Sequence, residues 1–178
     1  MSSSTADVAA STVAESTTLM FRYMPRKFVV KDMLKQLEWH VSRTHIDFVY
    51  VPWQRDAANN KGYAFVNFVD AQSAQAAFTS MQGTVWHSDP RMREIRIVPA
   101  AVQGLVANLQ RYIDSEPDSV HRPVVFSHGQ AIPLRVAVQR FCPDSMALQN
   151  FAAGDDWGNA ATYTSAGSDS EMNSAPRQ

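Results

Sequence analysis

Two aromatic residues two positions apart, Tyr63 and Phe65, have the clearest capacity for binding chemistry in this sequence. They lie in the octamer KGYAFVNF, residues 61–68, whose composition is typical of a β-strand. Successive side chains of a strand point to opposite faces, so both rings are expected to share a face with Lys61 and Asn67. Exposed rings of this kind stack on nucleobases with a gain of roughly 1–3 kcal/mol per base, and the lysine can contact a phosphate. The pattern therefore predicts a surface that binds single-stranded nucleic acid.

The octamer also satisfies every position of the consensus K/R-G-F/Y-G/A-F-V-x-F/Y, which marks an RNA recognition motif. The partner hexamer of such a motif is expected on the first strand, at LMFRYM, residues 19–24. Its second position, usually a stacking aromatic, is Met20, which still offers a polarizable apolar surface. Arg22 is expected to neutralise phosphate together with Lys61. Three further residues are weaker RNA-binding candidates: Trp53, Arg55 and Arg96.

Hydrophobic periodicity places the octamer in the third strand of a β-α-β-β-α-β order that is followed by a third helix. This order predicts a ferredoxin-like α+β fold, in which two helices cover one face of a four-stranded antiparallel sheet and the other face stays open. Strands are expected at 18–24, 46–51, 61–69 and 94–98, with a short extra strand at 122–127. Helices are expected at 31–42, between an Asp70 cap and Gly83, and at 102–115.

The two ends of the chain differ in composition from its middle. Residues 1–16 are dominated by Ser, Thr and Ala, and the stretch after the last expected strand is rich in Ser, Ala, Asn, Gly and Asp. Such segments bury too little apolar surface to offset chain entropy. We therefore expect a disordered tail at 1–16, one RNA recognition motif with a C-terminal helix extension at 17–128, and a mostly disordered tail at 129–178.

The net charge of -1 argues against a protein that grips nucleic acid by charge alone, so RNA contact must rely on stacking and a few placed cations. The single cysteine, Cys142, excludes a disulfide within the chain and a cysteine-based zinc site. Neither a signal peptide nor a run of roughly 18 apolar residues, the length of a membrane span, is found. We expect an intracellular monomer in the nucleus, the cytoplasm or both.

No pattern in the sequence indicates an enzyme, a metal site or a cofactor. The five histidines show no metal-ligand spacing with carboxylates. Ser127, His128 and Gly129 follow a strand but lack the G-x-S-x-G frame of a nucleophile elbow, and there is no glycine-rich phosphate loop. We therefore expect a binding protein without catalytic residues.

Four segments separate this chain from a generic RNA recognition motif: TTLMFRYMP, KGYAFVNF, AAVQGLVANLQRYIDS and HRPVVF. Together they resemble the C-terminal RNA recognition motif of the meiosis-regulator Mei-two-like proteins, over about residues 16–128. The resemblance implies single-stranded RNA binding and post-transcriptional regulation in development or meiosis. Tyr23 stands where that family usually has Asn, and Pro99 and Ala101 replace an aromatic and a basic residue.

Three interpretations remain open at the level of sequence. In the first, single-stranded RNA binds the open sheet face, with other proteins as further partners of the tails or of the third helix. In the second, the third helix covers Tyr63 and Phe65, or the face holds a peptide, and the domain is a protein-interaction module. In the third, the ligand is single-stranded DNA, because stacking does not read the sugar. The position of the third helix discriminates between the first two.

Overall fold

The computed structural model describes residues 13–86, 93–114 and 121–145. All four expected strands of the motif and its two helices form, and the predicted β-α-β-β-α-β order is confirmed. The elements of that order are β1 (Thr18–Arg22), α2 (Val30–Glu38), β2 (Ile46–Tyr50), β5 (Tyr63–Phe68), α3 (Ala71–Met81) and β6 (Arg96–Pro99). The later elements are α4 (Leu105–Asp114), β7 (Val124–Ser127), β8 (Gln130–Ile132) and α5 (Leu134–Phe141).

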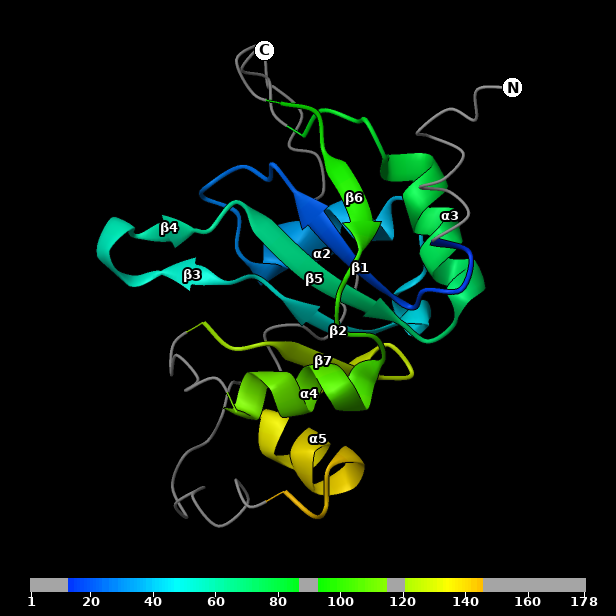
Figure 1. Cartoon of the computed structure of the whole chain (residues 1–178), viewed down its shortest axis with the longest axis vertical. Helices are drawn as coiled ribbons and strands as arrows, with labels where there is room; N and C mark the ends of the chain where they lie inside the picture. The colour runs from blue at the N-terminus through cyan, green and yellow to red at the C-terminus, as the bar shows by residue number, and fades with distance from the viewer. Residues whose placement is uncertain (1–12, 87–92, 115–120, 146–178) are drawn as a thin grey trace, which may run out of the picture.

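The sheet has six antiparallel strands in the order β6-β1-β5-β2-β7-β8. The predicted four-stranded sheet forms its larger part, and β7 and β8 extend it at the edge of β2. The expected extra strand at 122–127 is therefore part of the main sheet. Residues 53–60 form a small hairpin from β3 (Trp53–Gln54) and β4 (Asn59–Asn60), which projects from one end of the sheet (Figure 1).

One face of the sheet carries the main hydrophobic core. Alternate strand residues such as Leu19, Phe21 and Val66 are fully buried there against the apolar sides of α2 and α3. Helix α2 lies behind the sheet in Figure 1. The expected cap of α3 also forms, because the Asp70 carboxylate accepts a hydrogen bond from the Ser73 amide at 2.6 Å. Two helices on one face are thus explained by the strand alternation.

The opposite face is partly covered by the C-terminal elements. Helix α4 lies in front of β7, and α5 packs next to it (Figure 1). A second apolar cluster joins the sheet to both helices, and its buried members are Phe48, Leu109, Tyr112, Val125, Leu134, Ala137, Val138 and Cys142. Among the described residues, no helix is long and apolar enough to cross a membrane.

The folded elements continue past the domain boundary expected at residue 128. Strand β8 and helix α5 occupy residues 130–141, within the expected C-terminal tail. Helix α5 is held in place because Leu134, Ala137 and Val138 are buried at helical spacing against α4 and β7. The remaining tail residues, 1–12 and 146–178, lie outside the described residues.

Because α4 is held by buried side chains, its two faces should respond differently to truncation. The Leu109 side chain is fully buried against the sheet, whereas Val106 on the same helix is 52% exposed. We expect Leu109→Ala to lower the free energy of unfolding by about 2–5 kcal/mol. The matched variant Val106→Ala should change it by less than about 0.5 kcal/mol. Chemical denaturation measures both values, and equal effects would contradict the packing of α4 described above.

Candidate nucleic-acid interface

The sheet face opposite the main core carries a row of apolar side chains across four strands. Met20 lies opposite Val98 on β6 and Phe65 on β5, and Phe65 lies opposite Tyr50 on β2. All four side chains are half-buried. They are the floor of a surface that we call the platform, defined as Met20, Tyr50, Tyr63, Phe65 and Val98.

A row of cations lies beside this floor. Arg22 faces Tyr63 on one side and Arg96 on the other, and both arginine side chains are exposed. Lys61 is also exposed and lies two residues before β5, which begins at Tyr63. The expected strand at 61–69 is thus shorter at its start, because Gly62 adopts a left-handed φ of 85°. The structure therefore brings six of the predicted site residues together, one of them a weaker candidate: Met20, Arg22, Lys61, Tyr63, Phe65 and Arg96.

The two predicted stacking rings meet edge to face. The centroids of Tyr63 and Phe65 are 5.6 Å apart, and their planes are inclined at 74°. In this arrangement a base that stacks on one ring meets the edge of the other. A second parallel base can stack only if one ring turns about its side-chain bonds.

The other end of the same face is closed by a hydrogen-bond junction at Thr18. The Thr18 hydroxyl donates to Asn67 Oδ1 at 2.6 Å and accepts from the Gly104 amide at 2.9 Å and from Asn108 Nδ2 at 3.0 Å. A hydroxyl has one donor and two acceptor sites, so its capacity is fully used. Thr18 and Asn108 are buried. This junction fixes where α4 begins on the sheet.

Gln103 adds a second connection to the same strand. Its amide accepts from the Thr18 backbone amide at 2.8 Å and donates to the Thr18 carbonyl at 2.9 Å. Gly104 follows with a φ of 85°, a conformation that favours glycine. Thr17 and Thr18, from the segment TTLMFRYMP, therefore contact Gln103 and Gly104, from the segment AAVQGLVANLQRYIDS.

Asn67, which the sequence predicts to bind RNA, belongs to this junction. Its side chain is 2% exposed. Asn67 Oδ1 accepts from the hydroxyls of Thr17 and Thr18, and Nδ2 donates to Asp47 Oδ1 at 2.7 Å and to the Phe68 carbonyl. All four hydrogen-bonding sites of the amide are occupied. In this structure Asn67 joins β1, β2 and β5 and is not presented to a ligand.

Between the platform and α4 lies a hollow with a volume of about 480 Å³, which we call the slot. The platform side contributes Lys61, Tyr63 and Phe65, and α4 contributes Arg111 and Tyr112. Tyr112 closes one wall by packing edge-on against Tyr50, with ring centroids 5.3 Å apart. Helix α4 therefore buries Phe48, which is 1% exposed, but leaves the two predicted stacking rings open to the slot.

The weaker candidates lie away from the slot or are engaged elsewhere. The Trp53 ring stacks on His121 at a centroid distance of 4.1 Å and an interplanar angle of 13°. Arg96 is exposed on β6, on the cationic row beside the platform. Arg55 belongs to the 3₁₀ turn η2 (Arg55–Ala57), and its side chain lies outside the part of the structure that is described.

The residues of the slot that were not predicted from the sequence include Tyr50, Arg111 and Tyr112. The alternation of Phe48 and Tyr50 in the second strand indicates a shared face, as it does for Tyr63 and Phe65. The spacing of Leu105, Leu109 and Tyr112 indicates one face of the third helix. Neither signal says that the two faces meet, because that contact joins distant parts of the chain.

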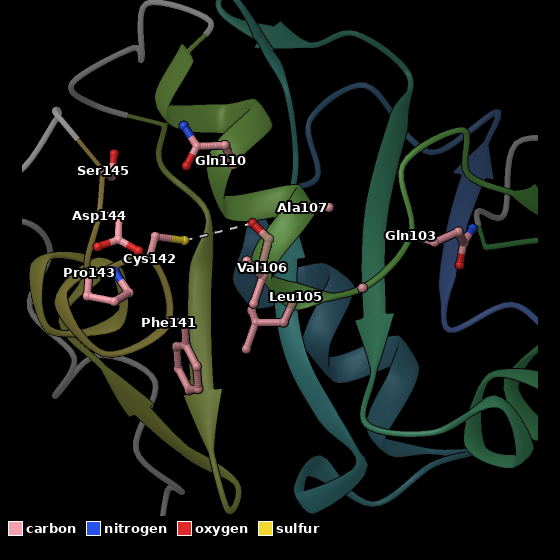
Figure 2. A pocket seen from close by; sticks show the side chains of 11 residues that line it. Gln103, Leu105, Val106, Ala107, Gln110, Phe141, Cys142, Pro143, Asp144 and Ser145 are labelled. Carbon is pink, nitrogen blue, oxygen red and sulfur yellow. Dashed lines mark hydrogen bonds between the residues drawn. The ribbon is translucent and has the colours of Figure 1, made fainter.

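A larger hollow of about 920 Å³ lies between α4 and the end of α5 (Figure 2). Val106, Ala107 and Phe141 line it, and the Cys142 thiol donates to the Val106 carbonyl at 3.9 Å. Burial raises the pKa of this thiol. The described residues that line this hollow include Asp144 but no Lys or Arg, so it does not suit a polyanion. Within the described part of the chain, no group of three His, Cys, Asp or Glu residues is placed to hold a metal ion.

This domain is an RNA recognition motif, as defined by its strand order, its intact octamer and the aromatic rings on its sheet face. Such motifs are RNA-binding modules and not enzymes. The family described as RNA recognition motif 2 matches residues 16–113, more than half of the chain, and the chain belongs to this family.

The chain is similar to several Mei-two-like proteins, as the four sequence segments predict. It is 29% identical to Protein MEI2-like 1 of Arabidopsis thaliana over 62% of this chain and 12% of that protein. It is 32% identical to Protein MEI2-like 6 of Oryza sativa subsp. japonica over 53% of this chain and 35% of that protein. It is 29% identical to Meiosis protein mei2 of Schizosaccharomyces pombe over 67% of this chain and 16% of that protein. The matched region is thus a minor part of each relative.

Solved structures of RNA recognition motifs are also similar. The Rna15 motif with bound RNA (GU) is 16% identical, with a TM-score of 0.43 over 55% of this chain and 97% of that chain. The Sex-lethal protein/RNA complex is 21% identical, with a TM-score of 0.40 over 50% of this chain and 49% of that chain. The family match, rather than these distant structures, carries the assignment.

The junction at Asn67 leads to a prediction about pH. Burial raises the pKa of Asp47 to about 6 from its ordinary value of 3.8, although the hydrogen bond from Asn67 acts in the opposite direction. The folded carboxyl therefore keeps its proton at a higher pH than the unfolded one, and this group lowers the free energy of unfolding as pH rises from about 4 to about 6. Asp47→Asn keeps an oxygen for the Asn67 amide and removes the charge. We expect this variant to raise the free energy of unfolding at pH 7, by on the order of 1–3 kcal/mol.

Chemical denaturation at several pH values measures this effect. The gain from Asp47→Asn should shrink as the pH falls and approach zero about one pH unit below 3.8, where the wild-type carboxyl is protonated in both states. Asp56→Asn is the control, because Asp56 is an exposed carboxylate on the η2 turn. A variant that is less stable than wild type at pH 7, or a gain that does not depend on pH, would contradict this assignment.

Proposed function

We propose that the chain binds single-stranded RNA on the platform, with bases inserted into the slot beneath α4. The observation that carries this proposal is the half-open pair Tyr63 and Phe65, which faces a hollow of about 480 Å³ flanked by Lys61 and Arg111. Aromatic rings beside cations are the elements that single-stranded nucleic acids need, because bases stack and phosphates pair.

The geometry supports a limited number of stacked bases. The rings of Tyr63 and Phe65 are inclined at 74°, so in this arrangement each base uses one ring, while Met20 and Val98 extend the apolar floor. The wall formed by Tyr50 and Tyr112 stops a base from sliding toward β7. Only an unpaired strand can reach rings inside such a slot. We therefore expect a preference for single strands over duplexes.

Charge favours RNA over a peptide as the occupant. The described residues that line the slot include Lys61 and Arg111 but no Asp or Glu. Arg22 and Arg96 continue the positive surface along β1 and β6. Because the whole chain is near neutral, this local charge should give a real but modest dependence of affinity on salt. The DNA titration below detects equal affinity for single-stranded DNA, and a failure to bind RNA would favour a peptide as the occupant.

The relatives supply the biological context of the proposal. One relative is named meiosis protein mei2, and this name supports a role in meiosis. We further propose that the module acts in post-transcriptional or developmental regulation, in the nucleus, the cytoplasm or both. Because the chain spans only 12% to 35% of the three relatives described above, the proposal concerns the RNA-binding step that this module can supply.

Removing the two rings should weaken RNA binding without unfolding the domain. We expect the double variant Tyr63→Ala plus Phe65→Ala to bind single-stranded RNA of randomised sequence at least about tenfold more weakly, because each lost stack costs on the order of 1–3 kcal/mol. The matched control is Trp39→Ala, which removes an aromatic ring that is 83% exposed at the end of α2, away from the platform. Fluorescence anisotropy measures the affinities, and circular dichroism checks the fold.

Equal RNA affinity of the wild type and the double variant would overturn the proposal. So would a loss of equal size in the Trp39→Ala control. Titration with DNA of the same sequences distinguishes a reader of the 2′-hydroxyl from a binder that only stacks bases.

A further inference from the structure

A second, smaller hollow of about 350 Å³ adjoins the slot where β1 ends. We call it the arginine pocket and define it by Arg22, Tyr23, Arg26, Lys61 and Arg93. It shares Lys61 and Tyr63 with the slot, so the two hollows meet at one of the stacking rings. None of the described residues that line it is acidic.

The guanidinium of Arg26 is held in position by the β3–β4 hairpin. Its Nη2 donates to Gln54 Oε1 at 3.1 Å and to Asn59 Oδ1 at 2.9 Å. Gly62 leaves room for this arrangement, because a Cβ at that position would lie 3.3 Å from Arg26 Nη1. Glycine at position 62 therefore allows both the left-handed backbone conformation and the close approach of the Arg26 side chain.

Tyr23 positions two further arginines. The guanidinium carbons of Arg22 and Arg93 lie 5.6 Å and 5.1 Å from the centroid of its ring, within the range of a cation–π interaction. Tyr23 has a φ of 67°, a left-handed conformation that is strained for a bulky side chain. Strain of this kind tends to lie at binding sites, where the surrounding structure maintains it.

The positive charge of the arginine pocket is not balanced within the described residues. No carboxylate in the described part of the chain forms an ion pair with any of its four cations. Like charges held close together repel each other, and a bound anion relieves that repulsion. An internal phosphodiester carries one negative charge, whereas a terminal phosphate monoester carries about -1.5 to -2 near pH 7. Four converging cations fit the more highly charged group.

We propose that the arginine pocket binds the dianionic terminal phosphate of an RNA strand whose adjacent base stacks on Tyr63. This proposal rests on the proposed function, because it places the phosphate next to the platform. It makes the domain a reader of RNA ends as well as of unpaired bases. Arg26 and Arg93 supply charge-assisted hydrogen bonds, and Tyr23 acts as a positioning residue.

The test compares one short single-stranded RNA of randomised sequence in three forms: with a 5′-phosphate, with a 3′-phosphate, and with hydroxyls at both ends. Each competes with an internally labelled RNA for the wild-type protein. We expect one of the two phosphates to raise the affinity about tenfold over the hydroxyl form, because hydrogen bonds to charged groups are the strong ones. The RNA end whose phosphate raises the affinity identifies the direction in which the RNA lies on the platform.

Four variants locate the effect. Arg93→Gln and Tyr23→Asn should bring the affinity ratio between phosphorylated and hydroxyl RNA close to one, the second because asparagine tolerates the left-handed backbone but lacks the ring. Tyr23→Phe keeps the ring and should keep the ratio. Arg111→Gln removes a cation of the slot outside the arginine pocket, so it should weaken all three RNAs alike.

A wild-type protein that binds the three RNAs equally would overturn this inference while the proposed function stands. An unchanged ratio in Arg93→Gln and Tyr23→Asn would also overturn it. If no RNA binds, the proposed function fails, and the pocket is tested with inorganic phosphate at constant ionic strength. Shifts of the arginine Nε–H resonances in wild type, and their loss in Tyr23→Asn but not Tyr23→Phe, would support a phosphate pocket. Absence of such shifts would refute it.

Discussion

The three hydrogen bonds of the Thr18 hydroxyl are the interactions on which the arrangement of this domain depends. The hydroxyl lies in the buried region where β1, β5 and the start of α4 meet, and it bonds Asn67, Gly104 and Asn108. If one of these elements shifted, a buried polar group would lose its partner, and that loss costs more free energy than a hydrogen bond contributes. The positions of the three elements relative to one another are therefore fixed. The position of α4 follows from this junction and from the apolar side chains beside it, rather than from the helix sequence alone.

The junction divides the sheet face into two parts with different roles. At the Thr18 end, α4 buries Phe48 and the face becomes part of a second core. Toward the end of β1 and the start of β6, Met20, Tyr63 and the neighbouring cations remain accessible. If a helix covered the whole face, bases could not stack on Tyr63 and Phe65. If no helix covered it, the platform would have no wall beside it. Partial cover turns a flat platform into a slot, which restricts what can enter.

The sequence predicts local structure and side-chain faces well, but it does not predict which distant segments meet. The octamer, the strand alternation and the Asp70 cap all depend on neighbours within a few positions, and each is confirmed in the fold. The burial of Asn67 depends on Thr18, and the slot wall depends on Tyr112 reaching Tyr50; these contacts join distant parts of the sequence. Alternation correctly assigns Asn67 to the open face, but it cannot show that α4 begins there.

The proposed function requires that RNA enters the slot while α4 stays in place. The most direct measurement is an NMR titration with single-stranded RNA that follows backbone shifts together with amide hydrogen exchange of α4. Chemical shifts should change mainly at Lys61, Tyr63, Phe65 and Arg111, and the α4 amides should stay as protected as in the free protein. Loss of protection along α4 on binding, or shifts confined to surfaces away from the slot, would contradict it.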